Sequence, residues 1–253
     1  MAMALTTITS CKNEAKNLDS TEVTSTEKIY EGTPISEEHD TEIDKLIAEM
    51  TLEEKIGMLH GNSMFTTGGV ARLGIPELKM ADGPLGVREE ISRDNWAPAG
   101  LTNDFATYYP AAGALAATFN EQMSYTFGNS VGQEMRARDK DMLRSPAINI
   151  IRTPLGGRTY EYMTEDPFLN KKMTVPLIVG LQDNDVMACV KHFAANNQET
   201  NRDFVDVQID ERTLREIYLP AFEAAIKEAH AYSVMGAYNK FRGEYLCEND
   251  YML

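Results

Sequence analysis

The sequence has few features of a membrane, disulfide-bonded or nucleic-acid-binding protein. None of its 253 residues belongs to an apolar run of about 18 or more, so no membrane span is predicted. The three cysteines, Cys11, Cys189 and Cys247, are widely spaced and form no CxxC pair, so no disulfide framework is expected. Only 24 basic residues oppose 39 acidic ones, a formal net charge of −15, which argues against nucleic-acid binding.

Motifs for several kinds of catalytic site are also missing. No histidine stands at ligand spacing from a cysteine or glutamate, so no metal site is predicted, although four histidines occur: His39, His60, His192 and His230. The sequence contains no phosphate-binding glycine loop, GxSxG elbow or Cys/His nucleophile signature. We therefore expect no cofactor. The acidic charge fits a protein that acts on a neutral small molecule, without identifying that molecule.

The first eleven residues contain a pattern similar to a bacterial lipoprotein signal. Ile8, Thr9 and Ser10 precede Cys11 as in a lipobox, but the stretch before them has no Lys or Arg. One interpretation of residues 1–11 is the remnant of a lipoprotein signal, for a protein of the periplasm or anchored to the outer membrane. The other is a soluble protein with an unrelated tail. Residues 12–40, rich in Glu, Ser and Thr, are predicted to form a disordered acidic linker.

Helices are predicted from about residue 41 onward. The spacing of apolar residues indicates helices over 41–50 and 120–138, and residues 176–182 are also helix-like. Thr51 and Glu54 form a capping box for a second helix near the start. Asp210 is expected to cap a later helix that is kinked at Pro220.

Short apolar runs between these helices predict strands. They begin with LKMAD and continue with residues 147–151, 186–190 and 232–238, and GALAAT is a further candidate. The alternation of strand, loop and helix predicts an α/β fold with parallel pairing. Four or five strands are too few to close a TIM barrel. Because the sequence ends in CENDYML, where another helix should follow, we expect a fragment.

Polar residues follow each of these strands, where ligands bind in parallel α/β folds. The candidate site residues are Asp82, Arg88, Arg158, Lys191, His192, Arg202, Met235 and Tyr238. Any single one could be a salt-bridged structural residue, but their shared position at the strand ends indicates a binding site. Charged side chains make strong hydrogen bonds to vicinal hydroxyls, so a polyhydroxylated ligand is expected.

Four ordered blocks resemble signature blocks of glycoside hydrolase family three, in its β-glucosidase branch. They are ADGPLGVR, INIIRTPLGGRTYEYMTEDPFL, VKHFAANNQETNR and SVMGAYNKFRG. The resemblance extends from about Leu46 to the last residue. It implies that residues 41–253 are an incomplete amino-terminal (β/α)8 TIM barrel, truncated after about five to six β/α units. It also implies a small-molecule carbohydrate substrate.

The resemblance assigns roles to the candidate residues. Hydroxyls of a glucosyl ring would be held by Asp82, Arg88, Arg158, Lys191, His192 and Arg202, and Met235 and Tyr238 would lie beside the anomeric carbon. Adjacent residues on a regular strand point to opposite faces, so Lys191 and His192 can share one pocket only where the backbone is irregular. The resemblance implies such an irregularity, with a cis non-proline peptide.

The family's two catalytic carboxylates have no counterpart in this sequence. The resemblance places the nucleophilic aspartate in an SDW block beyond Leu253 and the acid/base glutamate in a later domain. A retaining glycosidase needs two carboxyl groups about 5–5.5 Å apart, so these residues alone are expected to be inactive. Ion pairing and helix capping explain Glu161, Glu165 and Asp166 better than catalysis does.

Two details of the blocks narrow the expected activity. FAANNQET lacks the second histidine of the family's N-acetylglucosaminidases, and Asp82 stands where the family's xylosidases typically have Glu. The expected function is hydrolysis of terminal β-D-glucosyl residues by a retaining double displacement. The alternatives are a non-catalytic carbohydrate-binding or sensor protein derived from the same family, and a structural domain whose candidate residues are buried ion pairs.

Overall fold

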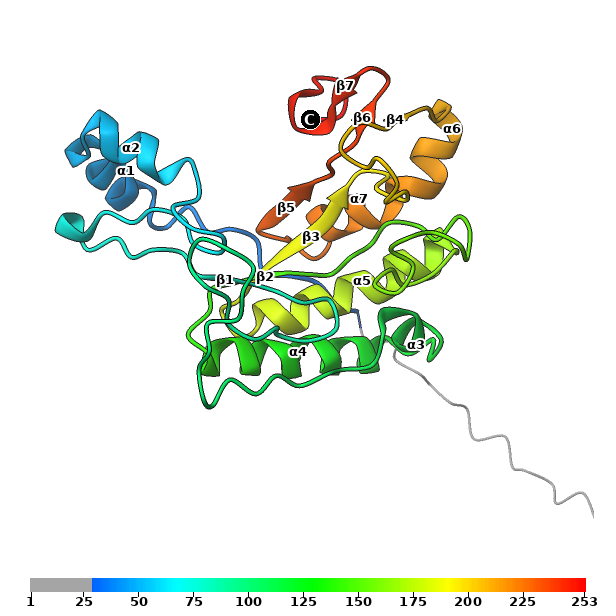
Figure 1. Ribbon diagram of the computed structural model, residues 1–253, viewed down its shortest axis with the longest axis horizontal. Coiled ribbons are helices and arrows are strands. Elements are labelled where there is room, and N and C mark those ends of the chain that lie inside the picture. Colours follow the sequence, from blue (N-terminus) through cyan, green and yellow to red (C-terminus); the bar gives the residue numbers. More distant parts are fainter. Residues whose placement is uncertain (1–28) are drawn as a thin grey trace, which may run out of the picture.

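The structure, a computed structural model, describes residues 29–253 (Figure 1). Its α-helices are α1 Asp40–Glu49, α2 Leu52–Met58, α3 Ala112–Ala116, α4 Glu121–Ala137, α5 Pro167–Gln182, α6 Glu211–Thr213 and α7 Pro220–Lys227. Its strands are β1 Met80–Asp82, β2 Met142–Arg144, β3 Met187–Phe193, β4 Asp206–Val207, β5 Ser233–Gly236, β6 Lys240–Phe241 and β7 Glu244–Tyr245. Two 3₁₀ turns, η1 Ala71–Leu73 and η3 Leu246–Glu248, and a π turn, η2 Leu214–Tyr218, complete the elements.

Two predictions concern residues before this range. The lipoprotein pattern at residues 1–11 and residues 12–28 of the predicted linker lie outside the described residues. From residue 29 onward, no helix is both long enough and apolar enough to cross a membrane.

The centre of the molecule is a four-stranded parallel sheet with the order β1-β2-β3-β5. Met80 pairs with Met142, Met142 with Met187, and Cys189 with Ser233. Strands that are successive in the sheet order are joined by connections that contain helices, so the predicted α/β class and parallel pairing are confirmed. A smaller sheet, with the order β4-β6-β7, lies on the side of β5 farthest from α1 and α2 (Figure 1).

Helices α4 and α5 lie side by side, and α5 also packs on β3 (Figure 1). Glycines let them approach closely: a Cβ atom on Gly128 would lie 2.1 Å from the Leu177 carbonyl oxygen, and one on Gly180 would lie 2.3 Å from that of Tyr125. Helix α5 is covered on nearly all sides and is apolar around most of its circumference, as expected of a helix within the core. The main core joins α4, α5, α7 and the strands.

Several predicted helices are confirmed with their caps. Thr51 Oγ1 accepts a hydrogen bond from the Glu54 N–H at 3.3 Å, and the Thr51 N–H donates to Glu54 Oε2 at 2.8 Å, which completes the capping box of α2. Asp210 Oδ1 accepts from the Thr213 N–H at 3.0 Å.

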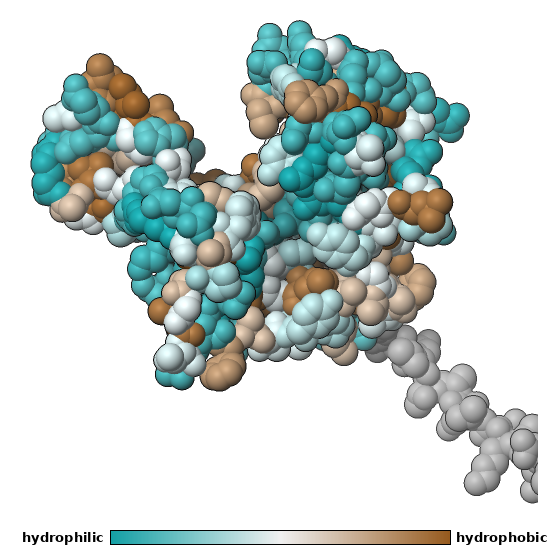
Figure 2. Space-filling model, in the orientation of Figure 1, coloured by the Kyte–Doolittle hydropathy of each residue, from teal (hydrophilic) through white to brown (hydrophobic). Residues whose placement is uncertain are grey.

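Helices α1 and α2 together form a lobe at one side of the molecule (Figure 1). Neither helix buries a residue, and Figure 2 shows apolar side chains on the surface of this α1–α2 lobe.

The prediction of a strand at residues 147–151 is wrong. The strand here is β2, five residues earlier, and residues 147–150 are buried without regular pairing. Pro146 has no N–H with which to continue the ladder, so regular pairing ends before it. Beyond this point Ala147 forms a single bridge with Lys191, and the side chain of Asn149 hydrogen-bonds to the His192 backbone.

One further prediction is corrected, and another, the helix with a kink at Pro220, is confirmed in more detail. GALAAT contains α3 instead of a strand, because alanine and leucine are strong helix formers and this segment packs beside α4 and α5. The helix predicted after Asp210 is divided into α6, the π turn and α7. Pro220 cannot donate to a carbonyl of the preceding turn, so the backbone widens over Leu214–Tyr218 and a new helix begins at the proline.

The predicted linker is interrupted by a packed segment at residues 29–32. Tyr30 is 8% exposed, its hydroxyl donates to Gln122 Oε1 at 2.7 Å, and its ring stacks on Tyr125 with centroids 5.4 Å apart. The Gly32 N–H donates to the Glu228 carbonyl oxygen at 2.8 Å. A Cβ atom on Gly32 would lie 2.0 Å from the Ala229 carbonyl oxygen, so the close approach requires glycine.

We expect Tyr30→Ala to lower the free energy of unfolding by about 2–4 kcal/mol, because it removes a buried aromatic ring and leaves a cavity. Urea denaturation followed by circular dichroism measures this difference. Ile29→Ala is the matched control, since Ile29 is 85% exposed and its loss should change the free energy by less than about 0.5 kcal/mol. Equal midpoints for the two variants would show that the segment does not stabilise the fold.

Candidate functional site

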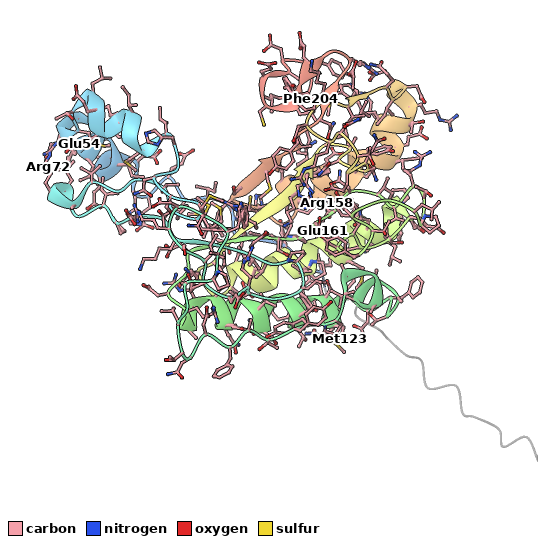
Figure 3. The ribbon with its side chains drawn as sticks, viewed as in Figure 1. Glu54, Arg72, Met123, Arg158, Glu161 and Phe204 are labelled. Carbon is pink, nitrogen blue, oxygen red and sulfur yellow. The ribbon has the colours of Figure 1, made fainter. Side chains whose placement is uncertain are left out.

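A cavity of about 330 Å³ lies at the carboxyl ends of β1 and β3. Four of the predicted site residues line it: Asp82, Arg88, Arg158 and Lys191. Tyr160 and Glu161 complete one wall, and residues 83–87 and 106–108 form the rest. Figure 3 shows Arg158 and Glu161 in the middle of the molecule, between the α1–α2 lobe and the β4–β6–β7 lobe.

Lys191 lies buried between two carboxylates. Its Nζ atom is 2.9 Å from Asp82 Oδ1 and 3.7 Å from Glu161 Oε2, and its side chain is 3% exposed. Burial alone would raise the pKa of Asp82, but the positive charges of Lys191, Arg144 and Arg88 more than offset this and lower it. Asp82 is therefore an ionised hydrogen-bond acceptor at neutral pH.

From Lys191 onward, acidic and basic side chains alternate in a series of ion pairs. Glu161 accepts a hydrogen bond from Arg158 Nε, and Arg158 Nη1 is 3.4 Å from Glu199 Oε1. Glu199 Oε2 accepts from Arg202 Nη1 at 3.0 Å. We call Asp82, Lys191, Glu161, Arg158, Glu199 and Arg202 the ion network. The prediction that Glu161 is an ion-pairing residue is confirmed.

His192 is 2% exposed and does not belong to the cavity lining. Burial and the nearby positive charges of Arg158, Lys191 and Arg202 lower its pKa to about 2, so its ring is neutral. The Tyr162 hydroxyl donates to the Asn196 carbonyl oxygen at 2.6 Å, so its oxygen can only accept from His192 Nδ1 at 3.3 Å. This assigns the proton to Nδ1 and leaves Nε2 as an acceptor.

The backbone of the Lys191–His192 pair is irregular, as expected. The Lys191–His192 and Phe193–Ala194 peptides are both cis, and the pairing register of β3 with β5 shifts between Lys191 and Phe193. Asn149 holds this segment on both sides: its Oδ1 accepts from the His192 N–H at 2.8 Å and its Nδ2 donates to the His192 carbonyl oxygen at 2.9 Å. Lys191 lines the cavity and His192 does not.

Besides His192, three more predicted site residues, Met235, Tyr238 and Arg202, lie outside the lining of this cavity. Met235 is the register partner of Lys191 on the neighbouring strand. Tyr238 is 53% exposed, and the Arg202 guanidinium lies 4.5 Å from its ring centroid. Arg202 pairs with Glu199, which in turn contacts the cavity residue Arg158.

Sequence reasoning missed Arg144, Asn149 and Glu199. Arg144 is the register partner of Asp82, its guanidinium lies 4.2 Å from the Phe65 ring centroid, and it was overlooked because β2 was placed too late. Glu199 stands three residues before Arg202, a spacing that could have indicated an ion pair. Nothing in the local sequence of Asn149 indicates its contact with residue 192. Among residues 29–253 no group of three or more metal-ligating side chains occurs.

Comparison with known proteins identifies the family of the chain. Residues 26–253 match the N-terminal domain of glycosyl hydrolase family 3. The chain belongs to glycosyl hydrolase family 3. The predicted family is therefore confirmed, and the described part of this family 3 chain has an α/β fold with four parallel strands.

The relatives of this family 3 chain include β-glucosidases. It is 51% identical over 201 residues to β-glucosidase BoGH3A of Bacteroides ovatus, covering 79% of this chain and 27% of that protein. It is 46% identical over 213 residues to thermostable β-glucosidase B of Acetivibrio thermocellus, covering 84% and 28%. The structure of β-glucosidase 3B from Thermotoga neapolitana in complex with glucose matches with a TM-score of 0.75 and 40% identity, covering 83% and 31%. The chain thus spans less than a third of the length of these relatives.

The lowered pKa of His192 makes stability depend on pH. The unfolded chain binds a proton at His192 below about pH 6.5 and the folded chain does not, so stability falls as pH decreases from there toward the folded pKa of about 2. Between pH 6 and 4.5, His192 should make the free energy of unfolding of the wild-type protein fall by up to about 1.4 kcal/mol for each pH unit. We expect His192→Gln to lack this contribution, so that its free energy of unfolding falls less steeply. Urea denaturation at several pH values measures this, and equal slopes for the two proteins would contradict it.

Proposed function

We propose that this chain supplies the glucose-binding subsite of a retaining β-glucosidase, which releases terminal β-D-glucosyl residues from oligosaccharides or glucosides. The observation that supports the proposal best is the pair of Lys191 and Asp82 at the edge of the cavity, in a chain closely similar to β-glucosidases. Both side chains are charged, largely fixed by their mutual contact, and within reach of a ligand in the cavity.

Two charged residues of the cavity, Asp82 and Arg158, retain unused hydrogen-bonding capacity. Asp82 Oδ1 accepts from Lys191 Nζ and the Gly83 N–H, while Oδ2 has no hydrogen-bond partner among the described residues. Arg158 uses Nε for Glu161 and Nη1 for Glu199, and its Nη2 likewise has none among residues 29–253. One acceptor and one donor group are thus available for sugar hydroxyls, in charge-assisted hydrogen bonds.

The same contacts argue that Asp82 and Glu161 are not the reacting carboxylates. A general acid needs a raised pKa, whereas that of Asp82 is lowered. Glu161 is buried between two cations. We therefore propose that the nucleophilic aspartate and the acid/base glutamate are not among these residues, and that the 253-residue chain binds glucose without hydrolysing glucosides.

Trp96 is better explained by loop anchoring than by sugar stacking. Its ring packs edge-on against Phe65 with centroids 5.7 Å apart, and the Arg88 guanidinium lies 5.3 Å from the Trp96 ring. Trp96 does not line the cavity. We propose that its contact orients Arg88 toward the sugar.

A chimaeric enzyme tests the proposed activity. The matching region of BoGH3A is replaced by this chain from residue 29 onward, and hydrolysis of an aryl β-glucoside is measured. We expect activity, and we expect Asp82→Asn to lower kcat/KM by about 100-fold or more, because the charge-assisted hydrogen bond to a sugar hydroxyl is weakened and the ion pair that fixes Lys191 is lost. Asp139→Asn is the matched control, since Asp139 pairs with Lys79 at the surface and should leave kcat/KM unchanged.

Calorimetric titration of the chain alone with glucose completes this test. Binding by the chain together with an inactive but folded chimaera would support a non-catalytic carbohydrate-binding protein. An active chimaera whose kcat/KM is unaffected by Asp82→Asn would refute the role of Asp82.

A further inference from the structure

Glu199 connects two arginines that come from different segments. Arg158 lies on the loop that precedes α5, and Arg202 lies on the loop between β3 and β4. One carboxylate oxygen of Glu199 is 3.4 Å from Arg158 Nη1 and the other is 3.0 Å from Arg202 Nη1. The side chain of Glu199 is 34% exposed and does not line the cavity. It therefore contacts Arg158, a residue of the cavity lining, from outside that lining.

The second glycine of PLGGR makes room for this carboxylate. A Cβ atom on Gly157 would lie 2.6 Å from Glu199 Cγ and 2.8 Å from Glu199 Cβ, closer than side chains approach one another. Any larger residue at position 157 would displace the stem of Glu199. The neighbouring Gly156 does not contact Glu199: a Cβ there would meet Thr159 Cγ2 at 3.1 Å. The glycine at 157 is thus specifically matched to the glutamate at 199.

We propose that Glu199 is a positioning residue that orients Arg158 for sugar binding and holds Arg202 beside it, and that Gly157 is required because it admits Glu199. The inference rests on the proposed glucose subsite. With Nε held by Glu161 and Nη1 by Glu199, the planar guanidinium of Arg158 presents its unpaired Nη2 to a ligand. Without Glu199, rotation of this group would have to be stopped on binding, which weakens affinity. The two guanidinium cations would also lose the anion between them.

Two measurements on the 253-residue chain test this inference. Calorimetric titration gives the Kd for glucose, and NMR of the arginine Nη groups gives the rate of rotation about the Nε–Cζ bond of Arg158 without any sugar. We expect Glu199→Gln, which has nearly the same shape, to weaken glucose binding about ten-fold and to speed the rotation at least ten-fold. Glu216→Gln is the matched control, because Glu216 pairs with Arg212 in an exposed carboxylate–guanidinium contact far from the cavity. It should change neither quantity.

Gly157 is tested by a double-mutant cycle. Gly157→Ala should weaken glucose binding about as much as Glu199→Ala does, and the double variant should bind within three-fold of Glu199→Ala alone. Additive losses would show that Gly157 acts independently of Glu199 and would overturn that half of the inference. Circular dichroism and the urea midpoint establish that each variant is folded.

The NMR measurement separates this inference from the proposed function. If the wild-type chain binds no glucose but Glu199→Gln still frees Arg158, the positioning role holds and the proposed function is wrong. If the chain binds glucose and Glu199→Gln changes neither Kd nor the rotation of Arg158, the positioning role is wrong and the subsite stands.

Discussion

The site depends on the burial of one cation, the Lys191 ammonium group. An unpaired ammonium in the interior is costly, so its charge must be met by anions with good geometry. Asp82 from the end of β1 and Glu161 from the loop before α5 provide them. This requirement ties three separate segments to one point, and removal of either carboxylate would leave Lys191 incompletely compensated.

The ion network extends this constraint across the carboxyl edge of the sheet. Charges alternate from Asp82 to Arg202, so each side chain is held by neighbours of opposite sign. Behind the network, His192 is neutral and Asn149 fixes its backbone. Held in this way, Asp82 and Arg158, which keep one free acceptor and one free donor group, are suited to binding a small polyhydroxylated ring, because little side-chain freedom is lost on binding.

Much of this arrangement could be predicted from the sequence, because it depends on local signals. The capping box at Thr51 correctly predicted the start of α2, and the apolar periodicity correctly predicted α4. The polar residues after β1 and β3 correctly predicted the edge of the sheet at which the cavity lies. The resemblance of four sequence blocks identified the family and the irregular peptide at Lys191. Asp82, Arg88, Arg158 and Lys191 meet at one cavity as expected.

The errors share a physical cause, which is dependence on contacts distant in sequence. Residues 147–151 have the composition of a buried strand, but regular pairing ends before Pro146. Beyond it, the side chain of Asn149 hydrogen-bonds to the backbone of His192. Tyr30 lies in an acidic, polar stretch and is buried only because α4 offers it a partner. The role of Glu199 depends on Gly157, which is distant in the sequence and adjacent in space.

A crystal structure of the chain with glucose tests the central claim most directly. We predict one glucose in the cavity lined by Asp82, Arg158 and Lys191, with a sugar hydroxyl within hydrogen-bond distance of Asp82 Oδ2 and another near Arg158 Nη2. A glucose ordered elsewhere with this cavity filled by water, or Asp82 and Arg158 turned away from the bound sugar, would contradict it.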